Sequence, residues 1–125
     1  MILIDTSVWV DHLRAGNKEL SALLDAGTVL AHPFVIGELA LGNLRQRAIV
    51  LNALSDLPRS CVATDAEVLH FIQRHELFGR GIGYIDAHLL AAVHLTPGTE
   101  LWTNDRRLRA VAIHLGMAVP VQASS

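Results

Sequence analysis

The sequence predicts an α/β fold, a three-layer α/β/α sandwich around a central, mostly parallel five-stranded sheet. Two observations support this prediction. Short apolar runs alternate with longer amphipathic segments along the whole 125-residue chain. No repeat, low-complexity tract or linker interrupts this alternation, so we expect residues 1–125 to form a single domain.

The expected elements follow this alternation in order. The strands are the short apolar runs, and the helices are the segments between them. Strands are expected at residues 2–5, 28–31, 60–63, 100–103 and 118–121, and helices at 6–14, 18–26, 33–42, 45–57, 64–77, 84–95 and 105–115.

Local signals mark the ends of several expected helices. Gly27 follows the leucine-rich face of the second helix and is a natural stop for it. Pro33 opens the third helix, and Pro58 follows the fourth. Thr64 and Glu67 have the spacing of a capping box at the start of the fifth helix.

Composition restricts the function only loosely. Ten basic and twelve acidic residues give a net charge of −2, whereas nucleic-acid-binding domains are usually basic. Nine of the ten basic residues are arginine, which fits a GC-rich genome as well as phosphate binding. Cys61 is the only cysteine, which excludes an intramolecular disulfide, and we expect it to be a buried thiol. With no signal peptide or membrane-length apolar run visible, we expect a cytoplasmic protein.

Four acids stand out by their positions. In an open parallel sheet, ligands bind beyond the carboxyl ends of the strands, where Asp5 and Asp105 are expected. Glu38 and Asp86 lie in segments that are apolar nearly all round, so we expect both to be buried. A buried carboxylate needs a partner or a metal, and neither segment contains Lys or Arg. A divalent cation at the sheet edge would satisfy all four acids.

Each acid except one also has a purely structural interpretation. Asp5 is placed to cap the helix after the first strand, and Asp105 or Asn104 to cap the last helix. Asp86 is placed to complement the dipole of its own helix. For Glu38 nothing in the local sequence offers such an explanation.

The type of ligand favours particular metals. Four carboxylates without a cysteine suit Mg²⁺ or Mn²⁺ rather than Zn²⁺. Crowded carboxylates cannot all ionise near neutral pH without cations. Two such ions about 4 Å apart can activate water and stabilise a phosphodiester under attack. The sequence therefore predicts phosphodiester hydrolysis.

Four ordered motifs resemble those of PIN domains, and more narrowly the VapC-type toxins of bacterial type II toxin–antitoxin pairs. They extend over nearly the whole chain: Ile2-Leu3-Ile4-Asp5-Thr6-Ser7, Gly37-Glu38-Leu39, Asp86-Ala87-His88-Leu89-Leu90-Ala91-Ala92 and Trp102-Thr103-Asn104-Asp105-Arg106-Arg107-Leu108. The resemblance implies a PIN-like sandwich. His88 departs from the pattern, because many relatives have an apolar residue there; we expect it to pack, with contact to the groove as the alternative.

The resemblance also implies an activity and partners. It implies a Mg²⁺- or Mn²⁺-dependent endoribonuclease that cleaves RNA such as tRNA or rRNA and so inhibits translation. It further implies a homodimer and a cognate antitoxin that blocks the site in a hetero-oligomer. The implied metal ligands and catalytic residues are Asp5, Glu38, Asp86 and Asp105, with Ser7, Thr103 and Asn104 in support.

Two arginines are candidates for contact with RNA. Arg80 lies in the glycine-rich loop 79–83, which fails the dinucleotide-binding pattern because Tyr84 replaces its third glycine. Arg106 belongs to the basic cluster of Arg106, Arg107 and Arg109 that follows Asp105, in which one of Arg106 and Arg107 is placed to face the substrate backbone. A plain interhelical loop and a solvated helix face are the respective alternatives.

Two other functions compete with the ribonuclease. One is a catalytically silent module that binds an antitoxin or RNA, which the intact set of four acids argues against. The other is a phosphatase or phosphoacceptor with Asp5 as the nucleophile. That reading lacks support, because Ser7 stands where the second aspartate of the phosphatase motif should be.

Overall fold

The computed structural model describes residues 1–120, among which seven helices and three strands form. The α/β class is as predicted, and each helix begins and ends within two residues of its expected bounds. In chain order the elements are β1 (Ile2–Ile4), α1 (Thr6–Ala15), α2 (Lys18–Asp25), β2 (Val29–Leu30), α3 (Pro33–Ala40), α4 (Arg47–Ser55), α5 (Asp65–His75), α6 (Tyr84–Leu95), β3 (Glu100–Trp102) and α7 (Arg106–His114).

The sheet is parallel, in the order β2-β1-β3. Ile2 lies opposite Val29 of β2, and Ile4 lies opposite Trp102 of β3. The Asp5 N–H continues this ladder by donating to the Trp102 carbonyl oxygen (2.9 Å). The carboxyl ends of β1 and β3 therefore meet at one edge, where a parallel sheet places its ligands.

The third expected strand, at residues 60–63, is reduced to a single parallel bridge between Ala31 and Arg59. The Cys61 N–H donates to the Thr96 hydroxyl (2.9 Å) instead of to a strand, so the ladder does not continue. Cys61 is also exposed, and the expectation of a buried thiol is wrong.

The fifth expected strand, at residues 118–121, is likewise a single bridge, between Leu101 and Ala118. Val121 lies outside the described residues. Within residues 1–120 the sheet therefore has three strands and two bridges rather than five strands, while its parallel direction is as predicted.

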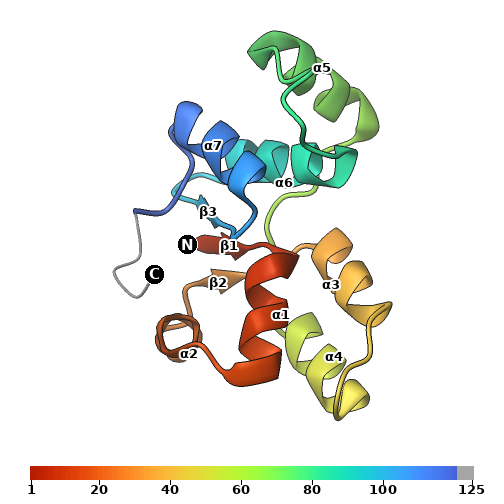
Figure 1. The fold of residues 1–125 in the computed structure, drawn as a ribbon, viewed down its shortest axis with the longest axis vertical. Helices are drawn as coiled ribbons and strands as arrows, with labels where there is room; N and C mark the ends of the chain where they lie inside the picture. Colours follow the sequence, from red (N-terminus) through yellow and green to blue (C-terminus); the bar gives the residue numbers. More distant parts are fainter. Residues whose placement is uncertain (121–125) are drawn as a thin grey trace.

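Helices lie on either side of the sheet. Figure 1 shows α1 to α4 toward one end of the molecule and α5 to α7 toward the other, with the strands between them. The central strand is fully buried at Leu3 and Ile4. α6 is buried continuously from Ala87 to Val93, whereas the other helices bury one stripe each. α6 is thus a core helix that carries Asp86 in its first turn.

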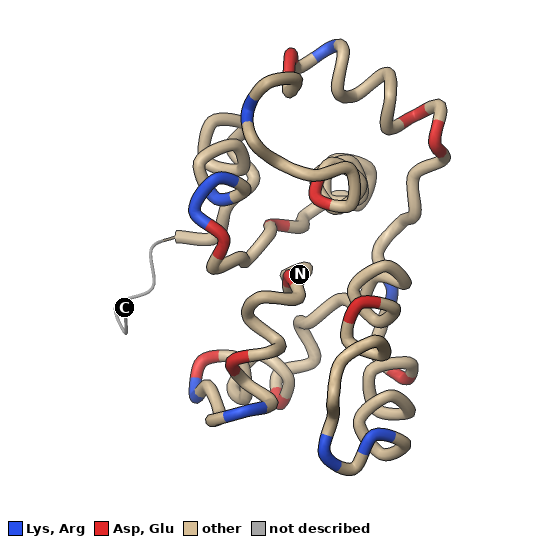
Figure 2. The backbone as a smooth tube through the Cα atoms, turned by 45° about the vertical axis from the view of Figure 1, so that its right-hand side comes forward, with Lys and Arg blue, Asp and Glu red and all other residues tan. Residues whose placement is uncertain are grey.

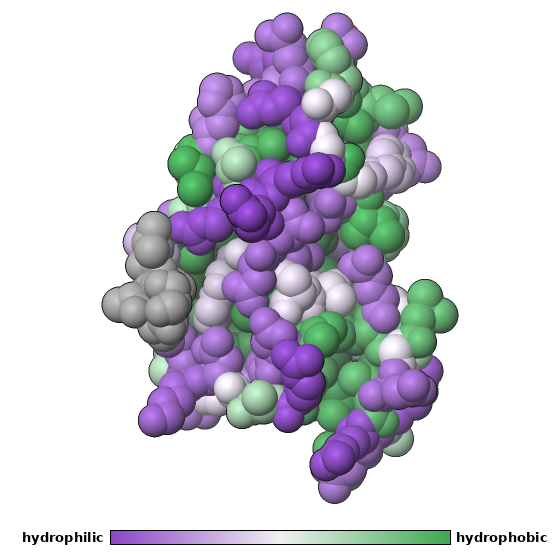
Figure 3. Space-filling view, in the orientation of Figure 1, coloured by the Kyte–Doolittle hydropathy of each residue, from purple (hydrophilic) through white to green (hydrophobic). Residues whose placement is uncertain are grey.

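The surface combines polar and apolar regions. Figure 3 shows apolar side chains on the face over α3 and α4. Leu41 and Ile49, at the end of α3 and on α4, are the exposed large apolar residues of this region. Among residues 1–120, no helix has both the length and the hydropathy needed to cross a membrane.

Candidate active site

The four acids picked out in the sequence come from four different places in the fold. Asp5 directly follows β1, Glu38 lies on α3, Asp86 lies in the first turn of α6, and Asp105 is the N-cap of α7. Figure 2 shows several acidic positions in the middle of the molecule, between the two groups of helices.

The electrostatics of Asp86 show that these carboxylates are neighbours. Partial burial raises the pKa of the Asp86 carboxyl above its usual value, and the charges of Asp5, Asp105 and Glu38 raise it further. A hydrogen bond from the Gly83 backbone acts in the opposite direction. The fold therefore brings Asp5, Glu38 and Asp105 within electrostatic range of Asp86.

Asp5 is held by two hydroxyl groups. Its Oδ2 accepts hydrogen bonds from Ser7 Oγ (2.7 Å) and from Thr103 Oγ1 (2.7 Å). Its side chain makes no capping bond to α1, so the capping interpretation of Asp5 is wrong. Asp5 and Thr103 are both buried, and Thr103 directly follows β3. These bonds therefore tie together the ends of the two central strands.

Backbone groups orient the two hydroxyls in turn. Asp105 N–H donates to Thr103 Oγ1 (3.0 Å), and Asn104 N–H donates to Ser7 Oγ (3.0 Å). Since each hydroxyl accepts from the backbone, its own proton is free to point at Asp5. The Asn104 side chain donates to Asp11 (3.0 Å), so Asn104 contacts this network through its backbone.

Glu38 is held by Thr6, a residue that the sequence analysis missed. Thr6 Oγ1 donates to Glu38 Oε1 (2.6 Å). Glu38 is exposed, so the expectation that it is buried is wrong. The reason is that α3 turns Val35 and Leu39 toward the core, and Glu38 projects from another side of the helix.

Asp86 and Asp105 both bond to the backbone at helix starts. Asp86 Oδ2 accepts from Gly83 N–H (2.9 Å), and Asp105 Oδ1 accepts from Leu108 N–H (2.9 Å). The capping interpretation of Asp105 is therefore confirmed. It does not exclude a second role, because one carboxylate has about four acceptor positions.

The four carboxylates share one feature. Each is fixed through one oxygen, and the second oxygen has no hydrogen-bond partner within the described part of the chain: Asp5 Oδ1, Glu38 Oε2, Asp86 Oδ1 and Asp105 Oδ2. Each carboxylate is thus oriented by the protein and retains an oxygen that could bind a cation.

The donor set fits a hard divalent cation. No three His, Cys, Asp or Glu side chains of residues 1–120 are close enough to surround one ion. Mg²⁺ does not need such a cage, because it keeps several waters and is usually bound through one or two carboxylates plus substrate phosphates. An oxygen-only set of oriented carboxylates therefore suits Mg²⁺ or Mn²⁺.

Three other sequence expectations concern the surroundings of this site. His88 is buried, and its ring packs against Phe34 and Tyr84 (centroids 4.6 and 4.8 Å apart), so it packs as expected. Arg80 and Arg106 are exposed, and neither forms an ion pair within residues 1–120. Both remain candidates for contact with RNA.

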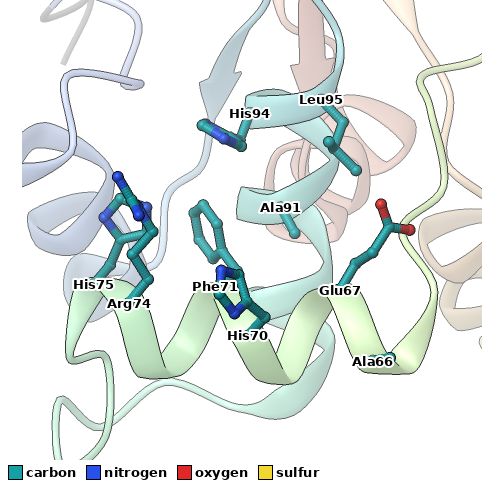
Figure 4. A pocket seen from close by; sticks show the side chains of 9 residues that line it. All are labelled: Ala66, Glu67, His70, Phe71, Arg74, His75, Ala91, His94 and Leu95. Carbon is teal, nitrogen blue, oxygen red and sulfur yellow. The ribbon is translucent and has the colours of Figure 1, made fainter.

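A cavity lined by histidines lies away from these acids. It has a volume of about 540 Å³ and lies between α5 and α6 (Figure 4). His70, Phe71 and His75 on α5 line it together with His94 on α6, and none of the four acids does. This cavity is therefore separate from the acid cluster.

Comparison with known proteins places the chain in a family. The model of the family described as "PIN domain" matches residues 2–114. The chain is similar to "Ribonuclease VapC32" of Mycobacterium tuberculosis, in strain CDC 1551 / Oshkosh and in strain ATCC 25618 / H37Rv. Each is 47% identical over 124 residues, which is 99% of this chain and 100% of the relative. This chain therefore belongs to the PIN-domain family and, within it, to the VapC-type ribonucleases.

Proposed function

We propose that this protein is a divalent-metal-dependent endoribonuclease, the toxin of a type II toxin–antitoxin pair, with Asp5, Glu38, Asp86 and Asp105 as its active site. The observation that carries the proposal is the set of four neighbouring carboxylates, each oriented through one oxygen. The full-length similarity to two proteins named as ribonucleases supports the same activity.

Each residue has a proposed task in phosphodiester hydrolysis. Bound Mg²⁺ or Mn²⁺ would supply the activation of water and the stabilisation of charge on the phosphate. Asp5, Glu38, Asp86 and Asp105 bind the ions through their second oxygens. Ser7 and Thr103 hold Asp5 in one orientation, as partners of metal ligands generally do.

The partners are proposed on the family resemblance. The substrate is an RNA such as tRNA or rRNA, cleaved in the cytoplasm, so that translation stops. A cognate antitoxin binds over the acids and blocks them, within a hetero-oligomer built on a homodimer of this chain. The single domain proposed for residues 1–125 carries all of these contacts.

The test is RNA cleavage by purified protein with Mg²⁺ or Mn²⁺, compared with EDTA. Asp5→Asn retains one side-chain oxygen that can accept from Ser7 and Thr103 but removes the charge, so cleavage should fall by about 10³-fold or more. Asp25→Asn is the matched control, because Asp25 is an exposed acid at the end of α2. Cleavage by folded Asp5→Asn at the wild-type rate contradicts the assignment. RNA binding without any cleavage by the wild type indicates a silent binding module.

A further inference from the structure

An arginine of α7 lies across the loop that precedes α6. If Gly81 carried a Cβ, that atom would be 2.8 Å from Cδ of Arg107 and 3.0 Å from its Nη1. Cβ atoms do not approach other side chains this closely, so the absence of a side chain at Gly81 makes room for Arg107. Gly81 also has a φ of +79°, which favours glycine. The Arg107 side chain therefore packs directly against the Gly81 backbone, and we call this position the seat of Arg107.

This seat adjoins two acids of the proposed active site. Arg107 follows Asp105 by two residues, and Figure 2 shows the basic start of α7 beside an acidic position. Two residues after Gly81, the Gly83 N–H donates to Asp86 Oδ2 (2.9 Å). The loop is thus fixed to Asp86 at one end and covered by Arg107 in its middle.

The Arg107 guanidinium has no acidic partner within residues 1–120. The close contacts of basic with acidic side chains found there, Arg14 with Asp11 and His88 with Asp65, do not involve it. Arg107 is exposed, so solvent and ligands reach it. A cation that packs against the loop before Asp86, follows Asp105 by two residues and pairs with no acid of residues 1–120 is available to an anion that binds there.

We propose that Arg107, seated on Gly81, binds a backbone phosphate of the RNA substrate next to Asp86 and Asp105. The proposal rests on the proposed function and names the residue that positions the strand. A guanidinium offers phosphate a planar pair of donors. Because the Arg107 side chain already packs against Gly81, it loses less conformational entropy when it binds a phosphate. Arg80 and Arg106 are also exposed, but neither is among the nearest neighbours of a glycine in the described residues.

A phosphate contact predicts a specific pattern of effects. It strengthens binding of all RNA sequences about equally, because the phosphate carries no sequence information. It also makes binding sensitive to salt, by a slope of about 0.7 in a plot of log affinity against log salt for one phosphate of a single strand. A residue with a merely structural role changes neither property in this way.

The first experiment measures RNA binding by the cleavage-deficient Asp5→Asn protein in Mg²⁺, over a series of NaCl concentrations. Adding Arg107→Ala should weaken binding of a labelled single-stranded RNA about tenfold at low salt and lower the salt slope by about 0.7. Arg109→Ala removes the same charge from the same helix and should change affinity less than twofold. If Arg107→Ala and Arg109→Ala weaken binding equally, only the net charge of the helix matters for RNA binding, and the proposal is overturned.

The second experiment displaces Arg107 without changing its charge. Gly81→Ala puts a methyl group into the Arg107 side chain, whereas Gly79→Ala has a similar φ (+73°) and nothing within 4 Å. Both variants should lower Tm similarly, but only Gly81→Ala should weaken RNA binding, by about the factor that Arg107→Ala gives. In the Arg107→Ala background, Gly81→Ala should cause no further loss. Equal binding by the two glycine variants contradicts the seat.

The outcomes separate this proposal from the proposed function. If wild-type protein cleaves RNA and Arg107→Ala binds and cleaves as well as wild type, the inference fails while the ribonuclease assignment stands. If the wild type cleaves no RNA in either metal, the proposed function fails whatever Arg107 does. If Arg107→Ala weakens binding of an antitoxin-like protein but not of RNA, the guanidinium serves a protein partner and the inference is wrong.

Discussion

Single hydroxyl groups determine how the carboxylates of this site are presented. Ser7 and Thr103 fix Asp5, and Thr6 fixes Glu38 through a 2.6 Å hydrogen bond across 32 positions of sequence. Glu38 is exposed and long, so without this bond its carboxylate would sample many rotamers. Thr6 is therefore a positioning residue for Glu38.

Thr6→Val tests this role. Valine keeps the shape of threonine but cannot donate, so we expect metal-dependent RNA cleavage to fall about tenfold or more, with a weaker apparent affinity for Mn²⁺. Thr6→Ser keeps the hydroxyl and should retain most of the activity. The measurements are initial cleavage rates over a Mn²⁺ titration. Unchanged Mn²⁺ dependence in Thr6→Val, with Tm within 2 °C or so of the wild type, would exclude a positioning role.

At the residue scale, sequence reasoning found charged groups but not their partners. Glu38 and Asp86 stood out because carboxylates are rare in apolar helical segments. The bond from Thr6 to Glu38 was not foreseeable, because nothing in a local pattern reports a contact between residues so far apart. The predicted burial of Glu38 failed for a related reason, since composition does not determine which stripe of a short helix faces the core.

At the element scale, α3 depends on an uncommon cap. The Nδ1 atom of His32 accepts a hydrogen bond from Phe34 N–H (3.0 Å) at the start of the helix that carries Glu38. His32 is fully buried. Burial, with smaller contributions from the charges of His88 and Arg59, lowers the pKa of His32 from 6.5 to about 4. The cap therefore requires a neutral imidazole.

This cap predicts a pH dependence of folding. Because the folded-state pKa of His32 is below the unfolded value, the unfolded chain binds a proton more readily between pH 6.5 and about 4, and stability falls as the pH falls through this range. One such proton lowers the free energy of unfolding by about 1.4 kcal/mol per pH unit. His32→Asn keeps a capping side chain but removes this titration. We expect its free energy of unfolding to change less steeply with pH than that of the wild type, by about that amount.

Urea unfolding at pH 7, 6 and 5 measures this slope. His32→Asn will be less stable at pH 7, because a smaller side chain leaves a cavity, so the slope rather than the absolute stability is the readout. His114→Asn, which changes an exposed histidine at the end of α7, should keep the wild-type slope. Parallel pH profiles for the wild type and His32→Asn would contradict this account of the cap.

The helices of this chain were easier to predict than its strands, for a physical reason. Helix ends carry local signals, and the capping box of Thr64 and Glu67 forms in the structure as the sequence predicts. A strand exists only if a distant partner continues the ladder. At Arg59 and Ala118 the pairing stops after one bridge, although the apolar runs at 60–63 and 118–121 look like strands.

At the scale of the whole molecule, the acid cluster is a property of the fold. Asp5 and Asp105 converge because β1 and β3 are neighbours, and α3 and α6 bring Glu38 and Asp86 to the same region. The order of the motifs predicted this convergence, but the distances and the free oxygens required the structure. Bringing like charges together from across the chain opposes folding unless a cation is bound.

A thermal-unfolding series tests this conflict between stability and function. Burial and the neighbouring carboxylates raise the pKa of Asp86, so its ionised form at pH 7 is less favourable in the folded state than in the unfolded state. In EDTA we therefore expect Asp86→Asn, which still can accept from Gly83, to raise Tm by roughly 2–4 °C. With Mn²⁺ the order should reverse, because the wild type gains stability by binding the ion and the variant gains much less. Asp25→Asn should follow the wild type in both conditions. A lower Tm for Asp86→Asn in EDTA, or an equal Mn²⁺ increment in both proteins, would mean that this carboxylate neither opposes folding nor binds the metal.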